Sequence, residues 1–331
     1  MRRFVFLAFL PALMFSAEHR VVAEHYYHTF SRSNPVLLRV APGDRVITKT
    51  VDSAGFDYQG VRRTKTHGNP LTGPFYVEGA EPGDALVVRL ERVRLNRNSG
   101  YTGYRLGGGA VLPEYVESMY PGRYKEDVVL KGRSDLVPWE IDLQRNTVRP
   151  REPLSPRARL EFPARPMLGC IGVAPAGDFT PTSGPAGPWG GNMDFNEVGE
   201  GATVLLPVFQ PGGLFYLGDG HALQGDGEPI GSGVETSLDV EFVIDLRKKA
   251  GLTGPRLENA DYLVSIGPQP EFSSSLDHGL QMATTDMIHW LTRDYGLDPV
   301  AAHMIIGYQG QYVVVTVAGT MALKIPKRVL R

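Results

Sequence analysis

The chain has 331 residues, of which 42% are hydrophobic and 21% are charged, proportions that are ordinary for a soluble globular protein. A chain of this length buries enough surface to fold without disulfides. Lysine and arginine total 34 against 36 aspartate and glutamate residues, a formal net charge of −2. This balance gives no electrostatic reason to expect a nucleic-acid partner or an anionic membrane surface, and we expect no nucleic-acid partner.

The N-terminus has the pattern of a targeting segment. Two arginines precede an apolar run over residues 4–15, and the small residues Ser16 and Ala17 follow. The run matches the hydrophobic region of a secretory signal and is too short to span a bilayer as a helix. We expect residues 1–17 to be a signal peptide, cleaved after Ala17 or as late as Ala23. The protein would then be exported, periplasmic or secreted, with no stable membrane span in the mature chain; an uncleaved anchor is the alternative.

Tight turns punctuate most of the chain, which contains 39 glycines and 26 prolines. Residues 41–44 read Ala-Pro-Gly-Asp and residues 81–84 read Glu-Pro-Gly-Asp, each between two short apolar runs. Because proline presets φ and glycine accepts positive φ, both predict a strand, a turn and a strand, which we interpret as two related β-hairpins. Strands are expected over residues 36–40, 45–51, 75–77, 85–90, 202–209, 213–217 and 238–246.

Residues 94–160 mix glycine, arginine and tyrosine with few apolar positions. They predict loops and edge strands, an insertion that would tune access to a site. We expect one domain over residues 24–330, which this insertion could divide into two β subdomains.

The hydrophobic period changes near the C-terminus. Apolar residues at three- and four-residue spacing predict an amphipathic helix over residues 277–293, capped by Ser275 or Asp277 and ended by Gly296. Asp298 and the proline after it then begin a short second helix, before a strand over residues 311–317. The predicted fold class is mainly β, sandwich- or barrel-like, with a small C-terminal α element, α+β overall.

The densest chemical signal lies in residues 217–228, Leu-Gly-Asp-Gly-His-Ala-Leu-Gln-Gly-Asp-Gly-Glu. Glycine allows close backbone approach, so the acids and the histidine can converge on one point. Imidazole and carboxylate suit zinc or a similar divalent ion. The spacing fits neither an EF-hand nor a dinucleotide-binding loop. The alternative is a polar, Gly-rich turn whose aspartates bond backbone amides.

Four further positions carry polar or reactive groups. Asn192 and Asp194 alternate, so in an extended segment both face one side and could orient an amide substrate; an Asx-turn is the alternative. Asp52 ends an apolar strand, from which its carboxylate could enter a cleft. Cys170 lies in an apolar run without a neighbouring base and is interpreted as a core residue. Without a nucleophile elbow or an H-E-x-x-H motif, metal-assisted attack by water is what remains for a hydrolase of this composition.

Several segments, taken in order, resemble the acetamidase/formamidase family over residues 25–325. The resemblance rests on residues 72–84, 172–175, 190–194, 218–228, 234–236 and 286–288. It implies a mostly β fold, hydrolysis of short linear amides to carboxylate and ammonia, and a homo-oligomer. The acids and the histidine of the family's site correspond here to Asp52, Asp219 and His221, and His28 occupies the family's early histidine position.

The resulting hypothesis is hydrolysis of a formamide- or acetamide-like substrate with a bound divalent metal, zinc being the expected ion. Glu235 is the candidate general base, and Asn192 and Asp194 would bind the carboxamide or support a ligand. The metal would be held by His28, Asp52, Asp219 and His221. Two alternatives stay open: a non-catalytic exported β protein that binds a small ligand or a metal, and an amidase for larger or cyclic amides.

Overall fold

Most of the chain forms β-sheets in the computed structural model, which describes residues 16–107, 109–118, 129–130, 133, 135–268 and 275–330. The predicted signal peptide therefore lies outside the described residues, except for Ser16 and Ala17. The largest sheet has nine strands, in the order β1 (Glu18–Arg20), β3 (Arg45–Lys49), β15 (Leu238–Arg247), β5 (Ala85–Leu95), β13 (Thr203–Pro207), β16 (Arg256–Glu258), β17 (Tyr262–Gly267), β19 (Thr320–Pro326) and β18 (Gln311–Thr316).

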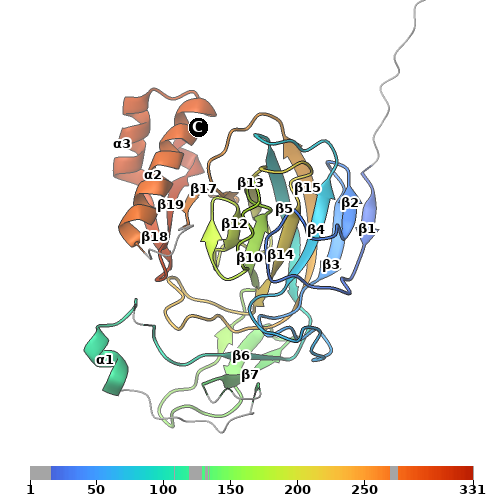
Figure 1. Cartoon of the computed structure of the whole chain (residues 1–331). Coiled ribbons are helices and arrows are strands. Elements are labelled where there is room, and N and C mark those ends of the chain that lie inside the picture. The colour runs from blue at the N-terminus through green and yellow to red at the C-terminus, as the bar shows by residue number, and fades with distance from the viewer. Residues whose placement is uncertain are drawn as a thin grey trace, which may run out of the picture.

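Two smaller sheets complete the β structure (Figure 1). A six-stranded sheet has the order β11 (Ala186–Gly187), β12 (Gly190–Asn192), β10 (Met167–Val173), β14 (Phe215–His221), β4 (Leu71–Val77) and β2 (Leu38–Val40). A four-stranded sheet has the order β6 (Ser99–Thr102), β7 (Val137–Asp142), β8 (Thr147–Pro150) and β9 (Phe162–Pro163). This last sheet and helix α1 (Pro113–Ser118) lie largely in the region where loops and edge strands were predicted.

The main core lies between the nine-stranded and six-stranded sheets. Phe242 of the first sheet contacts Phe75 and Phe215 of the second, with ring centroids 5.3 Å apart in each pair. All three side chains are fully buried. Edge-to-face ring pairs of this kind stabilise a core beyond what the burial of their apolar area provides. The predicted mainly β, sandwich-like class is confirmed.

The two Pro-Gly-Asp turns do not close hairpins, contrary to the prediction. The first joins β2 to β3 and the second joins β4 to β5, so each carries the chain from the six-stranded to the nine-stranded sheet. The turns are alike in detail: Gly43 and Gly83 have φ of 92° and 93°, and Asp44 and Asp84 each accept the backbone N–H three residues earlier. The local turn was therefore predictable, but the pairing of its flanking strands was not.

The C-terminal α element matches its prediction closely. Helix α2 (Leu276–Arg293) begins after Ser275, whose side chain accepts the N–H of His278, and α3 (Pro299–Gln309) begins after the cap residue Asp298. Figure 1 shows both helices beside β17, β18 and β19 at one end of the molecule. Arg256 of β16 binds α2 through a bidentate ion pair with Asp286, in which Nε and Nη2 donate to the two carboxylate oxygens at 2.8 and 2.9 Å.

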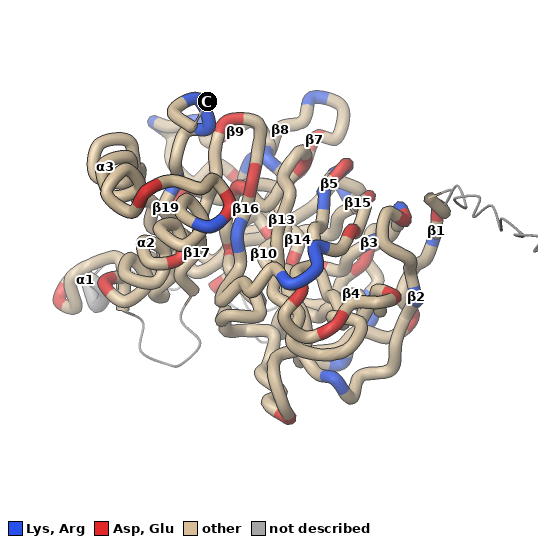
Figure 2. The backbone as a smooth tube through the Cα atoms, turned by 90° about the horizontal axis from the view of Figure 1, so that it is seen from above, with Lys and Arg blue, Asp and Glu red and all other residues tan. Residues whose placement is uncertain are grey.

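In the view of Figure 2, lysine and arginine residues are interspersed with aspartate and glutamate residues along the described backbone. Among the described residues, no helix is long and apolar enough to cross a membrane.

Candidate active site

The first half of the Gly-rich segment is a strand rather than the turn considered from sequence. β14 continues through His221 and pairs antiparallel with β10, where Gly218 lies opposite Cys170 and Gly220 opposite Leu168. Asp219 and His221 are two positions apart on this strand, so their side chains leave the same face. Gly220, between them, faces the other way, where a Cβ atom would lie 2.7 Å from Leu238 Cγ and from the Thr236 carbonyl oxygen, so neighbouring residues pack directly against that face.

A buried group of acids and one histidine gathers on this face. Ligand atoms of Asp194, Asp219 and His221 all lie within 4.8 Å of one another. His221 Nε2 is 3.7 Å from Asp219 Oδ1 and 3.1 Å from Glu235 Oε1. None of these four residues is more than 4% exposed.

Four polar atoms of this cluster have no hydrogen-bond partner among the described residues. They are Asp194 Oδ1, Asp219 Oδ1, His221 Nε2 and Glu235 Oε2, and all are buried. An unpaired buried polar atom costs about 1–3 kcal/mol, and buried charges are normally paired or bound to metal. Their convergence and their oxygen and imidazole chemistry fit a divalent cation.

Gly169 of β10 makes room for the two aspartates. A Cβ atom at this position would lie 2.4 Å from Asp194 Oδ1 and 2.5 Å from Asp219 Oδ2. Both aspartates also have positive φ, 48° and 56°, a region that is uncommon outside glycine and is found at functional sites. The backbone is thus shaped to bring two carboxylates together.

Gln224 determines which nitrogen of His221 carries the proton. Its Nε2 donates to the carbonyl oxygen of Asp194 at 2.6 Å, which leaves its Oε1 facing His221 Nδ1 at 2.8 Å. Because Oε1 can only accept, Nδ1 must carry the hydrogen. The lone pair of a neutral His221 then lies on Nε2 and points into the cluster, the arrangement expected of a metal-binding histidine.

Asn192 is held in one orientation beside the cluster. Its Oδ1 accepts hydrogen bonds from Asn69 Nδ2 and Cys170 Sγ, each at 2.9 Å. Its Nδ2 therefore points the other way and donates to Asp194 Oδ2. Asn192 thus orients an acid of the cluster, while Cys170 is fully buried, as predicted.

The electrostatics of the cluster reflect an excess of acid. Burial, reinforced by Asp219, raises the pKa of Glu235 to about 8 although His221 opposes the shift, and burial raises the pKa of Glu228 to about 7. Burial and the charges of Glu228 and Asp219 raise the pKa of Asp194 well above its usual value. Burial lowers the pKa of His221, but Glu235 and Asp219 outweigh it and raise that pKa well above normal. A bound cation would offset this excess of negative charge.

A pocket of about 290 Å³ opens onto the cluster. Its lining includes Asn192, Asp194, Asp219 and Glu235, together with Glu228, a residue of the Gly-rich segment for which no role was predicted. The acidic groups of the cluster can therefore be reached through this pocket.

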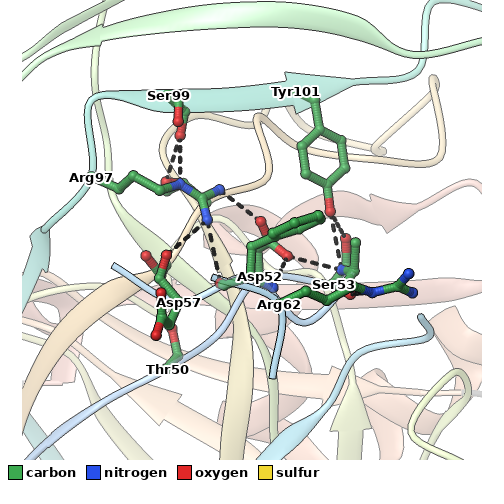
Figure 3. Close-up of polar contacts among 12 residues, drawn as sticks. Thr50, Asp52, Ser53, Asp57, Arg62, Arg97, Ser99 and Tyr101 are labelled. Carbon is green, nitrogen blue, oxygen red and sulfur yellow. Dashed lines mark hydrogen bonds and ion pairs between the residues drawn. The ribbon is translucent and has the colours of Figure 1, made fainter. Parts of the chain in front are cut away.

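Two residues predicted as metal ligands lie elsewhere. Asp52 is fully buried, and its oxygens are occupied by Arg97 Nη2 at 2.6 Å and by the backbone N–H groups of Ala54 and Phe56 (Figure 3). The half-buried His28 has its ring nitrogens against Gly68 O and Thr66 Oγ1, at 3.0 and 3.2 Å. The structure brings together Asp219, His221, Glu235, Asn192 and Asp194, but neither Asp52 nor His28.

Fold and site together define a β-sandwich protein whose pocket ends on a buried carboxylate–histidine centre. Comparison with known proteins gives the particular family. The model of the Acetamidase/Formamidase family matches residues 21–184 and 173–309. The chain therefore belongs to the acetamidase/formamidase family, which confirms the predicted family and the predicted enzyme class, an amide hydrolase.

Individual relatives agree with this assignment. The formamidase of Methylophilus methylotrophus is 26% identical, with 86% of this chain and 80% of that protein covered. A relative from Schizosaccharomyces pombe is 27% identical, and the match spans 68% of this chain but only 62% of that protein's length. The crystal structure of acetamidase from Yersinia enterocolitica has 27% identity and a TM-score of 0.77, with 97% of this chain and 95% of that chain covered.

Proposed function

We propose that this protein hydrolyses a short linear amide to its carboxylate and ammonia with the help of a bound divalent metal. The observation that carries the proposal is the convergence of four buried, unpartnered polar atoms at the end of a pocket. Relatives whose names are formamidase and acetamidase support a small amide as the substrate.

The proposed ligands are Asp194, Asp219 and His221, whose ligand atoms all lie within 4.8 Å of one another. This set keeps two of the sequence-predicted ligands, replaces Asp52 and His28, and moves Asp194 from substrate binding to metal binding. Asn192 and Gln224 support Asp194 and His221 from behind. Zinc is the proposed ion, because imidazole with carboxylates in a three-residue set suits a catalytic zinc site with an open position.

A divalent ion held there would lower the pKa of a water molecule and polarise the amide carbonyl. Glu235 takes the water's proton and later delivers it to the leaving nitrogen, whose departure as ammonia requires that proton. Its Oε2 is buried beside the proposed ligands and has no hydrogen-bond partner among the described residues, so this oxygen is free to accept the proton of the water. A base within reach of the centre favours this proposal over the non-catalytic binding protein.

We also propose export, with cleavage after Ala17 rather than after Ala23. Residues before that point are expected to be a signal, and β1 starts at Glu18 and pairs with β3 in parallel. Cleavage after Ala23 would remove β1 and the contact of His19 with Asp44 at 2.8 Å.

A homo-oligomer is proposed as well, and helix α3 supports it. The helix contains no Lys, Arg, Asp or Glu, and Val300, Met304 and Tyr308 are 62%, 53% and 79% exposed along it. Analytical ultracentrifugation of wild type and Met304→Glu tests this, since a purely monomeric wild type would contradict it.

The catalytic proposal is tested with purified protein on formamide, acetamide and longer linear amides, with ammonia release and metal content measured in parallel. His221→Ala should lose both metal and activity, because it removes the Nε2 lone pair. His289→Ala is the matched control, because His289 is an exposed residue of α2, and it should keep both. Full ammonia release by His221→Ala would overturn the proposal.

A further inference from the structure

The hydroxyl of Tyr101 lies at the centre of a small buried hydrogen-bond chain. Tyr101 is on β6, and its Oη is 3.0 Å from the backbone nitrogen of Ala54 and 2.9 Å from Ser53 Oγ. Figure 3 shows the tyrosine reaching down to Ser53 beside the Asp52 carboxylate. Ser53, Ala54 and Tyr101 all line the pocket that ends on the acidic cluster.

The chemistry of the groups determines the direction of this chain. A backbone N–H can only donate, so Tyr101 Oη accepts from Ala54. The phenol proton then needs an acceptor of its own, because Tyr101 is only 7% exposed. In the part of the chain that the structure describes, Ser53 Oγ is the acceptor recorded for it. Tyr101 therefore donates to Ser53.

This direction leaves the proton of Ser53 available to the pocket. Glu235 lines the same pocket as Ser53, and its buried Oε2 has no hydrogen-bond partner among the described residues. The main chains of Tyr101 and Glu235 also bond each other in both directions, at 3.3 and 2.8 Å. One tyrosine thus holds both the backbone of Glu235 and the hydroxyl of Ser53, and all three residues line one pocket.

The Asp52–Arg97 ion pair fixes the loop that carries Ser53. Asp52 accepts two N–H groups from this loop, and Arg97 donates to the carbonyl oxygens of Phe56, Asp57 and Ser99 (Figure 3). Ser99 belongs to β6, the strand of Tyr101. The Asp52–Arg97 pair therefore joins the loop that carries Ser53 to β6, the strand that carries Tyr101.

We propose that Ser53 is a positioning residue of this enzyme, which donates its hydroxyl proton to the Glu235 carboxylate and keeps that carboxylate facing the pocket. Tyr101 polarises and orients Ser53, and the Asp52–Arg97 pair holds both in place. The inference rests on the proposed function, in which Glu235 moves the proton from water to the leaving nitrogen.

The test compares Ser53→Ala, Ser53→Thr and Tyr101→Phe in kcat, KM and bound metal. Ser53→Ala should lower kcat by about 10–100-fold, the usual cost of losing an outer-shell partner, with KM and metal content near wild type. Ser53→Thr retains the hydroxyl and should recover kcat to within a few-fold. Adding Tyr101→Phe to Ser53→Ala should cost little more, since both act through one chain.

Thr236→Val is the matched control, because Thr236 follows Glu235 and bonds Ser99 O at 3.1 Å without belonging to the chain. It should leave kcat unchanged. Wild-type kcat in Ser53→Ala, or an equal loss in Ser53→Thr, would overturn the inference while leaving the amidase proposal intact. An inactive, metal-loaded wild type would instead overturn the amidase proposal.

Discussion

Gly169→Ala should disable the site by a purely steric route. The backbone of Gly169 does not have positive φ, so alanine introduces no conformational strain there. The new Cβ would lie 2.4 Å from Asp194 Oδ1 and 2.5 Å from Asp219 Oδ2, whereas real Cβ contacts essentially never fall below 3.0 Å. Each carboxylate must therefore move by about half an ångström or more, or β10 must retreat.

The size of that shift sets the expected loss. Metal–ligand distances tolerate only about 0.2 Å, and disturbing outer-shell partners alone costs about 10–100-fold in affinity. Displacing two proposed ligands should exceed that range, so we expect metal affinity to fall by more than about 100-fold. Overpacking of this kind typically costs about 1–3 kcal/mol, and the free energy of unfolding should fall by a similar amount.

The assay is metal titration by calorimetry, with urea unfolding of the metal-free protein in parallel. Gly225→Ala is the control: Gly225 lies in the Gly-rich segment that carries Asp219, its φ is not positive, and an added Cβ would meet nothing within 4 Å. It should bind metal like wild type. If Gly169→Ala also binds metal with wild-type affinity, the two aspartates are not the ligands and the reasoning fails.

Three further predictions concern groups around the site and the turns. Gln224→Leu should lower metal affinity by about 10–100-fold in the same titration, because His221 loses the acceptor that fixes its tautomer; unchanged affinity would contradict the assignment. Asp52→Asn should cost about 3–5 kcal/mol in urea unfolding by leaving the buried Arg97 charge uncompensated, and a loss below about 1 kcal/mol would refute the role of the pair. Burial opposes the lowered pKa of Asp84, but Lys248 and two backbone N–H groups outweigh it. Its stabilising effect is therefore complete above the unfolded-state pKa of about 4 and lost as the pH falls through the lower folded value. Asp84→Asn should thus be less stable than wild type at pH 7, with the gap closing in acid; a gap that is constant with pH would contradict this.

Local patterns predicted the elements well because they depend on neighbouring residues. The caps at Ser275 and Asp298 and the turn at Gly43 follow from side-chain and φ preferences within a few positions. Which sheet receives each strand depends on distant pairings, and for that reason the chain crossing between sheets was mistaken for two hairpins.

The site residues likewise divide into those that the local sequence indicates and those that only long-range strand pairing brings in. Asp219 and His221 were predictable because glycines flank them on one segment. Asp194 reaches them only because Asn192 of β12 pairs with Cys170 of β10, while Gly218 of β14 pairs with that same residue from the other side. The spacing of these residues along the chain does not predict that strand register. Position along the chain likewise suggested Asp52, whose carboxylate is used by Arg97 instead.

The proposed metal-dependent amidase activity is measured directly as ammonia release from formamide and acetamide. Purified mature protein should be assayed as isolated, after chelation, and after one equivalent of zinc is restored. We expect ammonia release that chelation abolishes and that zinc restores in proportion to the amount of bound metal. Ammonia release that survives complete removal of the metal would contradict the proposed metal dependence. No ammonia release from fully metal-loaded protein would contradict the proposed amidase activity.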